Sequence, residues 1–291
     1  MKVGIIGTGL MGFPMAINIA KKFELKSFNR TFEKMKDLEK YKITLCNTLE
    51  SLSRNTDVII SMLPGDKEVI ETINQIKNFI KSGTVFIDMS STKVSTANEC
   101  YNILKEKDSN FIDAPVSGGP EGAKSGSLAI MAGGDEDAFL KVKNVLETMG
   151  NPTLVGPAGS GQVSKLCNQI IVGVTIGAVA EAIILCEKNG ADPNKFIKAV
   201  SGGFADGKIL QNHGQRMIDK DFVARGKNIT HLKDMNNILE CASQKGIKLP
   251  ISQLIKNMFQ NLCDSGFENE DHCSLYKEIS NKKISGAHNQ N

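Results

Sequence analysis

Residues 1–16, MKVGIIGTGLMGFPMA, decide the fold of this chain. A short apolar run, Val3 to Ile6, precedes glycines at positions 7, 9 and 12, and a second apolar run extends from Met11 to Ile19. These runs are typical of a buried strand and the helix that follows it. Glycine is entropically costly here, so the G-x-G-x-x-G spacing indicates a tight turn, close approach of a pyrophosphate and close helix–strand packing.

An ordinary flexible loop is the alternative interpretation of these glycines. Their place at the start of a strand–helix–strand pattern favours a dinucleotide-binding loop instead. We expect this loop to bind the cofactor through Gly7, Thr8, Gly9, Leu10, Met11 and Gly12.

The first 160 residues alternate strand-like and helix-like segments, which is the pattern of a mainly parallel sheet. Strands are predicted at 3–6, 25–28, 57–62, 84–88 and 111–113, with a later pair at 128–132 and 153–155. Beyond residue 161 strand patterns give way to helical runs at 162–189, 192–200, 207–219, 228–245 and 251–264. We therefore predict an α/β protein, with a Rossmann domain over 1–161 and an all-helical domain over 162–291, joined by one long helix.

Composition restricts the classes of partner. The net charge of the 291-residue chain is only +3, and its basic and acidic residues are interspersed, so nucleic acid is not an expected ligand, whereas a small anionic substrate is compatible. The seven cysteines form no C-x-x-C pair and are expected to be reduced thiols in the cytoplasm, mostly in the core. The four histidines have no metal-ligand spacing, so we expect no metal site.

One segment has nearly the length and apolarity of a membrane span, residues 166–186, LCNQIIVGVTIGAVAEAIILC. It contains Asn168, Gln169 and Glu181, and the N-terminus runs directly into the glycine loop with no visible signal peptide. A buried helix at the centre of a soluble protein is therefore the favoured interpretation, and no membrane partner is expected.

The second predicted strand ends in SFNRT, residues 27–31. An acidic residue here would accept the ribose 2′-hydroxyl of NAD, and none is present. Asn29 can hydrogen-bond the ribose or phosphate, and the planar guanidinium of Arg30 suits a 2′-phosphate. We predict NADP as the preferred cofactor, with NAD as the alternative; a solvated loop cation is the simpler interpretation of Arg30.

Three further stretches carry candidate chemistry. In DAPVSGGPEGAKSGSL, residues 113–128, Ser117, Gly118 and Gly119 could form a small anion cradle or a plain glycine turn. In GSGQVSKLCNQ, residues 159–169, Lys165 shares one face of a predicted helix with Asn168 or, alternatively, with Gln169. In HLKDMNNILE, residues 231–240, Lys233 and Asp234 begin an amphipathic helix, where a surface ion pair is the alternative.

Taken in order, the motifs GTGLMGFPMA, NRT, SMLP, DMSS, DAPVSGG, GxGxxxKxxN and KD span nearly the whole chain. In this set the chain resembles the β-hydroxyacid dehydrogenase family, which includes 3-hydroxyisobutyrate dehydrogenase, tartronate semialdehyde reductase and the glyoxylate/succinic semialdehyde reductases. The resemblance implies a dimer or tetramer assembled through the helical domain. It also implies a catalytic lysine at Lys165 and a loop for the substrate carboxylate at Ser117, Gly118 and Gly119.

The remaining roles also follow from the resemblance. Asn168 matches the residue that orients the substrate, and we also assign substrate binding to Asp234, which lies beside the cofactor-contacting Lys233. Further cofactor contacts fall on Thr31, Met62, Leu63, Pro64 and Ser91. Two positions depart from the family pattern. Ser91 stands where the family has a cofactor-contacting threonine, and the neighbouring Thr92 could make that contact instead. Gly226 stands where several relatives have a phenylalanine. The substrate therefore does not transfer from any single relative.

The chemistry agrees with these roles. A lysine ammonium can protonate the alkoxide formed when an aldehyde is reduced, provided that burial or a nearby cation such as Lys233 lowers its pKa from about 10.4. We therefore predict an NADP-preferring reductase of a small aldehyde acid. Three alternatives fit the sequence less well. Imine reductases of the same architecture tend to replace the lysine, and a non-catalytic dinucleotide-binding module would have lost the lysine or the serine motif, whereas both are present here. A decarboxylating sugar-phosphate dehydrogenase would need a longer helical domain.

Overall fold

The chain forms two compact units in the computed structural model, which describes residues 1–281. The first unit is Met1–Lys165 and the second begins at Leu166, so the division falls inside one continuous helix, α7 (Ser160–Lys188). The domain division predicted at residue 161 lies in the same helix. Residues 282–291 of the predicted second domain lie outside the described residues.

The first unit is built on one twisted sheet. Its strands are β1 (Lys2–Ile6), β2 (Glu24–Phe28), β3 (Thr44–Leu45), β4 (Val58–Ser61), β5 (Val85–Asp88), β6 (Asn110–Asp113), β7 (Val116–Ser117), β8 (Leu128–Gly133) and β9 (Gly150–Gly156). The order is β3-β2-β1-β4-β5-β6-β8-β7, with β9 paired to β8. Strands β1 to β6 pair in parallel, whereas β8 runs antiparallel to β6 and β7.

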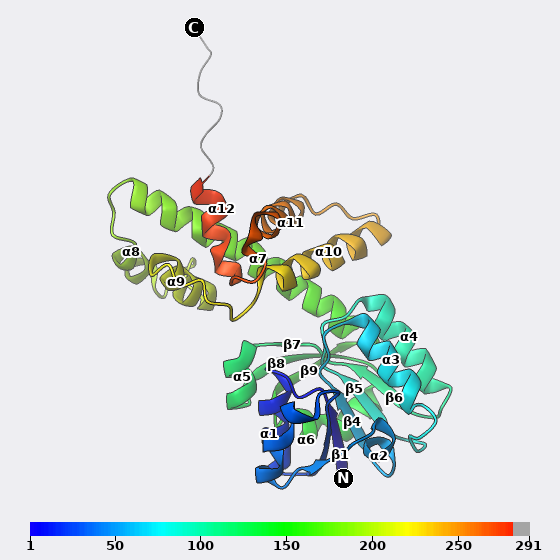
Figure 1. Ribbon diagram of the computed structural model, residues 1–291. Coiled ribbons are helices and arrows are strands. Elements are labelled where there is room, and N and C mark those ends of the chain that lie inside the picture. Colours follow the sequence, from blue (N-terminus) through cyan, green and yellow to red (C-terminus); the bar gives the residue numbers. More distant parts are fainter. Residues whose placement is uncertain (282–291) are drawn as a thin grey trace. The chain divides into compact units, whose positions relative to one another are not determined.

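Helices cover both faces of this sheet, as Figure 1 shows. They are α1 (Gly12–Ala20), α2 (Leu49–Ser53), α3 (Asp66–Ile76), α4 (Val94–Lys105), α5 (Gly119–Ser125) and α6 (Glu136–Leu146). Apolar residues of α1, α5 and α6 pack on one face, and those of α2, α3 and α4 pack on the other. Buried on both faces, the central strands are nearly continuous apolar runs, such as VIIS in β4.

The second unit is helical throughout its described elements. After α7 come α8 (Pro193–Val200), α9 (Gln215–Ile218), α10 (Asn228–Gln244), α11 (Pro250–Leu262) and α12 (Leu275–Asn281). Single turns at Leu210–Gly214, Cys263–Phe267 and His272–Ser274 connect them, and Phe32–Lys34 and Lys36–Tyr41 are similar turns in the first unit.

The predicted fold class is confirmed, including the parallel sheet, the helical second half and the long helix between them. Every strand predicted from the sequence is present, with ends that agree to within three residues. Strands β3 and β7 are additional, because two residues are too short for the alternation that marks a strand.

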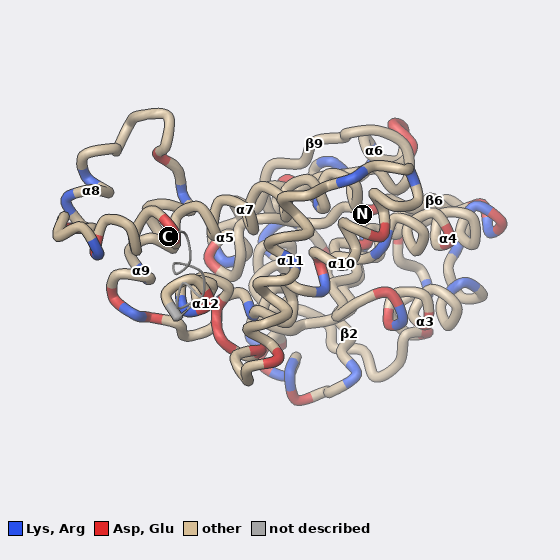
Figure 2. Tube along the Cα trace, turned by 90° about the horizontal axis from the view of Figure 1, so that it is seen from above, with Lys and Arg blue, Asp and Glu red and all other residues tan. Residues whose placement is uncertain are grey.

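The burial predicted for α7 is observed only in part. Within the described residues it is the one helix long and apolar enough to cross a membrane, and a third of its most apolar window is buried inside the chain. Ile171 and Leu185 are 65% and 67% exposed. Of the seven cysteines, Cys46, Cys100 and Cys273 are buried, so the expectation that most fill the core is wrong. Figure 2 shows basic and acidic residues interspersed along both units.

Candidate active site

The glycine loop after β1 has a conformation that excludes side chains at its first and third glycines. Gly7 has a φ of +91°, which side-chain-bearing residues rarely adopt, and a Cβ on Gly12 would overlap the carbonyl oxygen of Gly7. A Cβ on Gly9 would meet no atom within 4 Å. The loop is therefore open toward solvent at its second glycine, where a phosphate group would approach, and closed at the other two.

The turn after β2 is joined to this loop by Asn29. The Asn29 Oδ1 atom accepts a hydrogen bond from the Thr8 backbone N at 3.1 Å, and its Nδ2 donates to the Thr31 carbonyl at 2.8 Å. Asn29 therefore holds the turn against the glycine loop. Arg30 is exposed and makes no hydrogen bond or ion pair with any part of the chain that is described, so its guanidinium is available to an anion.

The loops after β4 and β5 are held together by a buried carboxylate. The Asp88 Oδ1 atom accepts hydrogen bonds from the Ser61 and Ser90 hydroxyls at 2.7 and 2.6 Å. The Ser90 Oγ in turn accepts the backbone N–H of Leu63 at 2.9 Å. Burial raises the pKa of Asp88 to about 6, against the lowering effect of the two serines. This network fixes the backbone of the SMLP segment, to which cofactor contacts were assigned.

A second buried carboxylate, Asp113 at the end of β6, holds the start of α7. Its Oδ1 accepts the Gly159 N–H at 2.7 Å, and its Oδ2 accepts the Gln162 N–H at 2.8 Å. Burial raises the pKa of Asp113 to about 7, although both N–H donors oppose the shift. The Gln162 side chain accepts from the Thr92 N at 3.1 Å and donates to the Ser90 carbonyl at 2.9 Å. Thr92 is thereby drawn into the interior, where it is 2% exposed.

Lys165 lies one helical turn beyond this anchored start. Its Nζ donates a hydrogen bond to the Val116 carbonyl at 2.9 Å. Val116 and Ser117 form β7, and the exposed Gly118 and Gly119 follow directly. The structure therefore bonds the predicted catalytic lysine to the residue that directly precedes the predicted carboxylate-binding segment, inside the first unit.

In the second unit three polar side chains form a chain of hydrogen bonds. The Asn168 Nδ2 donates to Gln169 Oε1 at 2.8 Å, and the Gln169 Nε2 donates to Asp234 Oδ2 at 2.7 Å. Lys233 Nζ lies 3.6 Å from the other Asp234 oxygen. The predicted substrate residues Asn168 and Asp234 are thus linked through Gln169, and the ion pair of Asp234 with Lys233 has a buried carboxylate.

Sequence reasoning missed the supporting residues Asp88, Ser90, Asp113 and Gln162. A signal for two of them was present, because DMSS and DAPVSGG each begin with an aspartate at the end of a predicted strand. An acid that directly follows a buried apolar strand can lie in the interior, where a carboxylate requires hydrogen-bond donors. No comparable signal marked Ser90 or Gln162.

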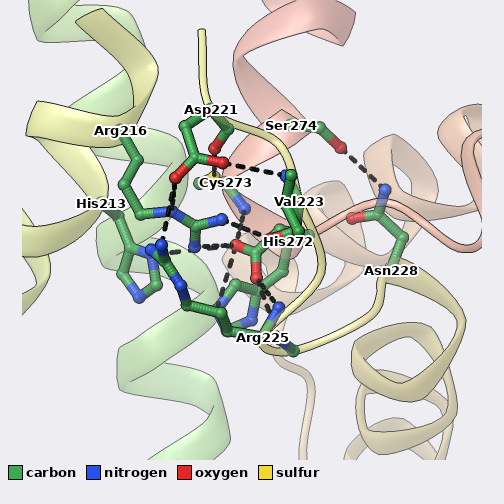
Figure 3. Close-up of polar contacts among 11 residues, drawn as sticks. His213, Arg216, Asp221, Val223, Arg225, Asn228, His272, Cys273 and Ser274 are labelled. Carbon is green, nitrogen blue, oxygen red and sulfur yellow. Dashed lines mark hydrogen bonds and ion pairs between the residues drawn. The ribbon is translucent and has the colours of Figure 1, made fainter. Parts of the chain in front are cut away.

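A second polar cluster, the Asp271 cluster, lies beside the loop that leads into α10 (Figure 3). Asp271 is fully buried and accepts the Arg216 guanidinium at 2.8 Å and the backbone N–H groups of Arg225, Gly226 and Cys273. Arg216 also donates to the Val223 carbonyl at 2.6 Å. These contacts fix residues 219–227, and with them the start of the helix that carries Lys233 and Asp234.

The same cluster contains side chains of metal-binding type, which the sequence spacing did not show. Potential ligand atoms of His213, Asp271 and His272 lie within 4.8 Å of one another. Arg216 already places its cation on the carboxylate, so the geometry is that of a buried ion pair. A Cβ on Gly226 would lie 3.1 Å from the His272 ring, which therefore fills space beside the position where several relatives place a phenylalanine.

Acid should destabilise the second unit through these histidines. Burial lowers the pKa of His213 and His272 to about 4, while Asp271 is held well below its usual pKa by His272 and three N–H donors, despite its burial. The unfolded histidines titrate near 6.5, so the unfolded chain binds more protons between pH 6.5 and 4 and stability falls through that window. At pH 5 the loss is on the order of 2 kcal/mol for each histidine.

Urea unfolding followed by circular dichroism at pH 7 and pH 5 measures this effect. The double variant His213→Gln/His272→Gln should lose less stability between the two pH values than the wild type. The raised pKa values of Asp88 and Asp113 act in the opposite direction, since these groups gain protons on folding, but they are common to both proteins and cancel. An equal loss in both proteins would contradict the role of the histidines.

The first unit fits a bound dinucleotide on its own geometry. Gly7 and Gly12 admit no side chain without overlap or strain, while the space at Gly9 is open. The Thr8 hydroxyl at the same loop is buried and has no hydrogen-bond partner among the described residues. A polar ligand on the loop would satisfy such a group.

Comparisons with known proteins show the family of the chain and its NAD(P)-binding domains. A family model described as the NAD binding domain of 6-phosphogluconate dehydrogenase matches residues 2–167, and one described as NAD-binding of NADP-dependent 3-hydroxyisobutyrate dehydrogenase matches 159–279. The 2-hydroxy-3-oxopropionate reductase of Escherichia coli (strain K12) is 36% identical, over 96% of this chain and 97% of that protein. Probable 3-hydroxyisobutyrate dehydrogenase-like 2 of Arabidopsis thaliana is 33% identical, over 91% and 89%.

Among solved structures, 3-hydroxyisobutyrate dehydrogenase of Mycobacterium tuberculosis with L-serine has a TM-score of 0.88. The match covers 96% of this chain and 98% of that one, at 24% sequence identity. At that identity the likeness shows that the two proteins share a fold.

Proposed function

This chain belongs to the β-hydroxyacid dehydrogenase family and is an NAD(P)-dependent oxidoreductase acting on CH–OH groups, and we propose that it reduces a small aldehyde acid with a preference for NADPH. The aldehyde acids we propose are of the tartronate, methylmalonate and succinic semialdehyde type. The observation that carries this proposal is the contact between the Lys165 ammonium and the Val116 carbonyl, which puts a proton donor beside Ser117, Gly118 and Gly119.

The mechanism assigns proton transfer to Lys165. A bound nicotinamide cofactor supplies the hydride that reduces the aldehyde carbon. Lys165 donates a proton to the carbonyl oxygen as negative charge develops on it, and in the oxidative direction its neutral amine accepts the proton back. The hydrogen bond from its Nζ to the Val116 carbonyl orients the ammonium toward the segment that begins at Ser117.

Ser117, Gly118 and Gly119 hold the substrate carboxylate in this proposal. The Ser117 hydroxyl and backbone N–H groups can donate to a carboxylate, and the loop is exposed at both glycines. Hydrogen bonds to a charged group are stronger than those between neutral groups, so the loop would select acids over neutral aldehydes. In the second unit, Asn168 and Asp234 are the residues that we propose contact the substrate.

The preference for NADPH rests on the turn after β2. Arg30 has no competing partner in the described chain, and the turn from Ser27 to Thr31 contains no carboxylate that would repel a 2′-phosphate. The family model that matches residues 159–279 is itself described by an NADP-dependent enzyme, which supports the same choice.

A substrate panel tests the proposal directly. Initial rates with tartronate, methylmalonate and succinic semialdehydes and glyoxylate should exceed those with isobutyraldehyde, which has no carboxylate. Each substrate is measured with NADPH and with NADH. Equal rates with the neutral aldehyde, or turnover of cyclic imines in place of the aldehyde acids, would contradict the proposal.

Replacing Ser117 should chiefly weaken substrate binding. We expect Ser117→Ala to raise KM for the preferred aldehyde acid on the order of tenfold, because a hydrogen bond to a charged group contributes about 1.5–3 kcal/mol. The KM for isobutyraldehyde, which lacks the carboxylate, serves as the internal control and should not change. A weaker affinity for NADPH with an unchanged substrate KM would remove Ser117 from the carboxylate site.

We also propose that the protein is a homodimer or homotetramer in which α7 contributes to the interface. The exposed apolar residues Ile171 and Leu185 on this helix support that arrangement, since burial of apolar surface drives association. Multi-angle light scattering of the purified protein measures the state, and a monomer at micromolar concentration would contradict it.

A further inference from the structure

We propose that Asp113 is a positioning residue that acts through Lys165. It caps the first turn of α7 and so fixes the backbone position of Lys165 in the same helix. This inference rests on the proposed role of Lys165 as the proton donor. Asp113 was assigned no role from the sequence, and it lies in the interior, fully buried at the end of β6.

The carboxylate of Asp113 binds both ends of the turn that opens α7. Gly159 precedes the helix and Gln162 lies within its first turn, and each donates its backbone N–H to a different oxygen of Asp113. These N–H groups have no partner within the helix itself, and the helix N-terminus carries a partial positive charge that favours an anion. Asp113 thus fixes both the position and the rotation of this turn.

Close packing leaves the turn no alternative position. A Cβ on Gly161 would overlap the backbone oxygens of Asp113 and Met131, and so the helix start lies directly against β6 and β8. Gln162 is 1% exposed and connects the same turn to the Ser90 carbonyl and the Thr92 N–H. The turn is therefore held by contacts to the carboxyl ends of the strands that border the site.

Lys165 follows this turn at once, and its far end returns to the same segment. Its Nζ is bonded to the carbonyl of Val116, three residues after Asp113 in the chain. Segment 113–116 therefore holds the lysine at both ends, the helix start through the Asp113 carboxylate and the ammonium through the Val116 carbonyl. A shift of the cap moves the backbone of Lys165 relative to the carbonyl that orients its ammonium.

Asp88 is a matched control for this role. It is the register partner of Asp113 on the neighbouring strand β5 and is equally buried. Its hydrogen bonds come from Ser61 and Ser90, so it reaches α7 only indirectly, through the Ser90 carbonyl that Gln162 binds. Replacing either aspartate by asparagine removes a buried carboxylate of the same size, but only Asp113 bonds the turn that opens the helix of Lys165 directly.

The test is a pair of double-mutant cycles in the full-length enzyme with NADPH and its best aldehyde acid. Asparagine offers one acceptor oxygen where two N–H donors require two, so Asp113→Asn should lower kcat about 10- to 100-fold with the Kd of NADPH within about threefold. In the Lys165→Ala background the same change should cost less than about threefold, because its effect passes through the absent lysine. Asp88→Asn should lower the rate by the same factor in both backgrounds.

Hydrogen exchange provides a measurement that does not depend on activity and complements the double-mutant cycles. Hydrogen exchange should show faster exchange at the amides of Gly159 and Gln162 in Asp113→Asn than in the wild type, with amides of β4 unchanged. If Asp113→Asn does not fold, Gln162→Ala removes the two side-chain bonds that tie the same turn to Thr92 and Ser90 without altering the carboxylate, and it should show the same dependence on Lys165.

Each outcome separates the two proposals. An additive effect of Asp113→Asn with Lys165→Ala, or an unchanged kcat, overturns the positioning role while leaving Lys165 as the proton donor. If Lys165→Ala itself retains its activity, the proposed role of Lys165 fails and the positioning role fails with it. In that case the exchange rates still report whether Asp113 caps the helix.

Discussion

Lys165→Ala should lose about 100-fold or more in kcat while the protein still binds NADPH. A general acid contributes about 10²- to 10⁴-fold to the rate, and alanine leaves no group that can protonate the developing alkoxide. The loss should appear in kcat and in kcat/KM together, because the proton is transferred in the transition state and not in the ground state. Steady-state kinetics with the preferred aldehyde acid measure both constants.

Controls separate this effect from a general disturbance of the fold. The Kd of NADPH, measured by quenching or enhancement of its fluorescence, should remain within a few-fold of the wild-type value. Lys143→Ala on α6 removes a lysine that pairs with Glu147 at the surface and should leave kcat unchanged. A Lys165→Ala variant within a few-fold of wild-type kcat would exclude this lysine as the proton donor.

Substitution of two residues in the turn after β2 should reverse the cofactor preference. A charge-assisted contact between Arg30 and the 2′-phosphate is worth about 1.5–3 kcal/mol. Since about 1.36 kcal/mol corresponds to a factor of ten, the wild type should prefer NADPH by about 10- to 100-fold in kcat/KM. The double variant Asn29→Asp/Arg30→Leu should prefer NADH, because its carboxylate accepts the ribose hydroxyls and repels the phosphate.

The structure makes Asn29→Asp a conservative change at the glycine loop. Aspartate keeps an oxygen that can accept the Thr8 N–H and loses only the bond to the Thr31 carbonyl. Arg54→Leu is the control, because Arg54 is an exposed arginine of the same unit that pairs with Glu50. Rising ionic strength should weaken NADPH binding more than NADH binding. Equal wild-type turnover with both cofactors at low salt would show that Arg30 is only a solvated residue.

The sequence by itself determined the elements and their order. Strand and helix periods are local properties, so the buried run Val3–Ile6 and the glycines after it were sufficient to predict β1, its loop and α1. The steric need at Gly12 also follows from a neighbour five residues away, the carbonyl of Gly7, whereas the space at Gly7 is closed by Met62 directly after β4. The ordered motifs then located Lys165 and Ser117, because each lies in a short stretch that can be identified without knowing what it touches.

Only the tertiary structure decided which side chains support the site. The bonds from Gly159 to Asp113 and from Gln162 to Ser90 join residues 46 and 72 positions apart. They depend on the register that pairs Asp88 with Asp113, which no local pattern specifies. The Asp271 cluster likewise joins His213 to His272 through the packing of separate helices. Buried polar groups must find partners wherever the fold places them, and for this reason their roles were determined by the folded chain and not by any single stretch of its sequence.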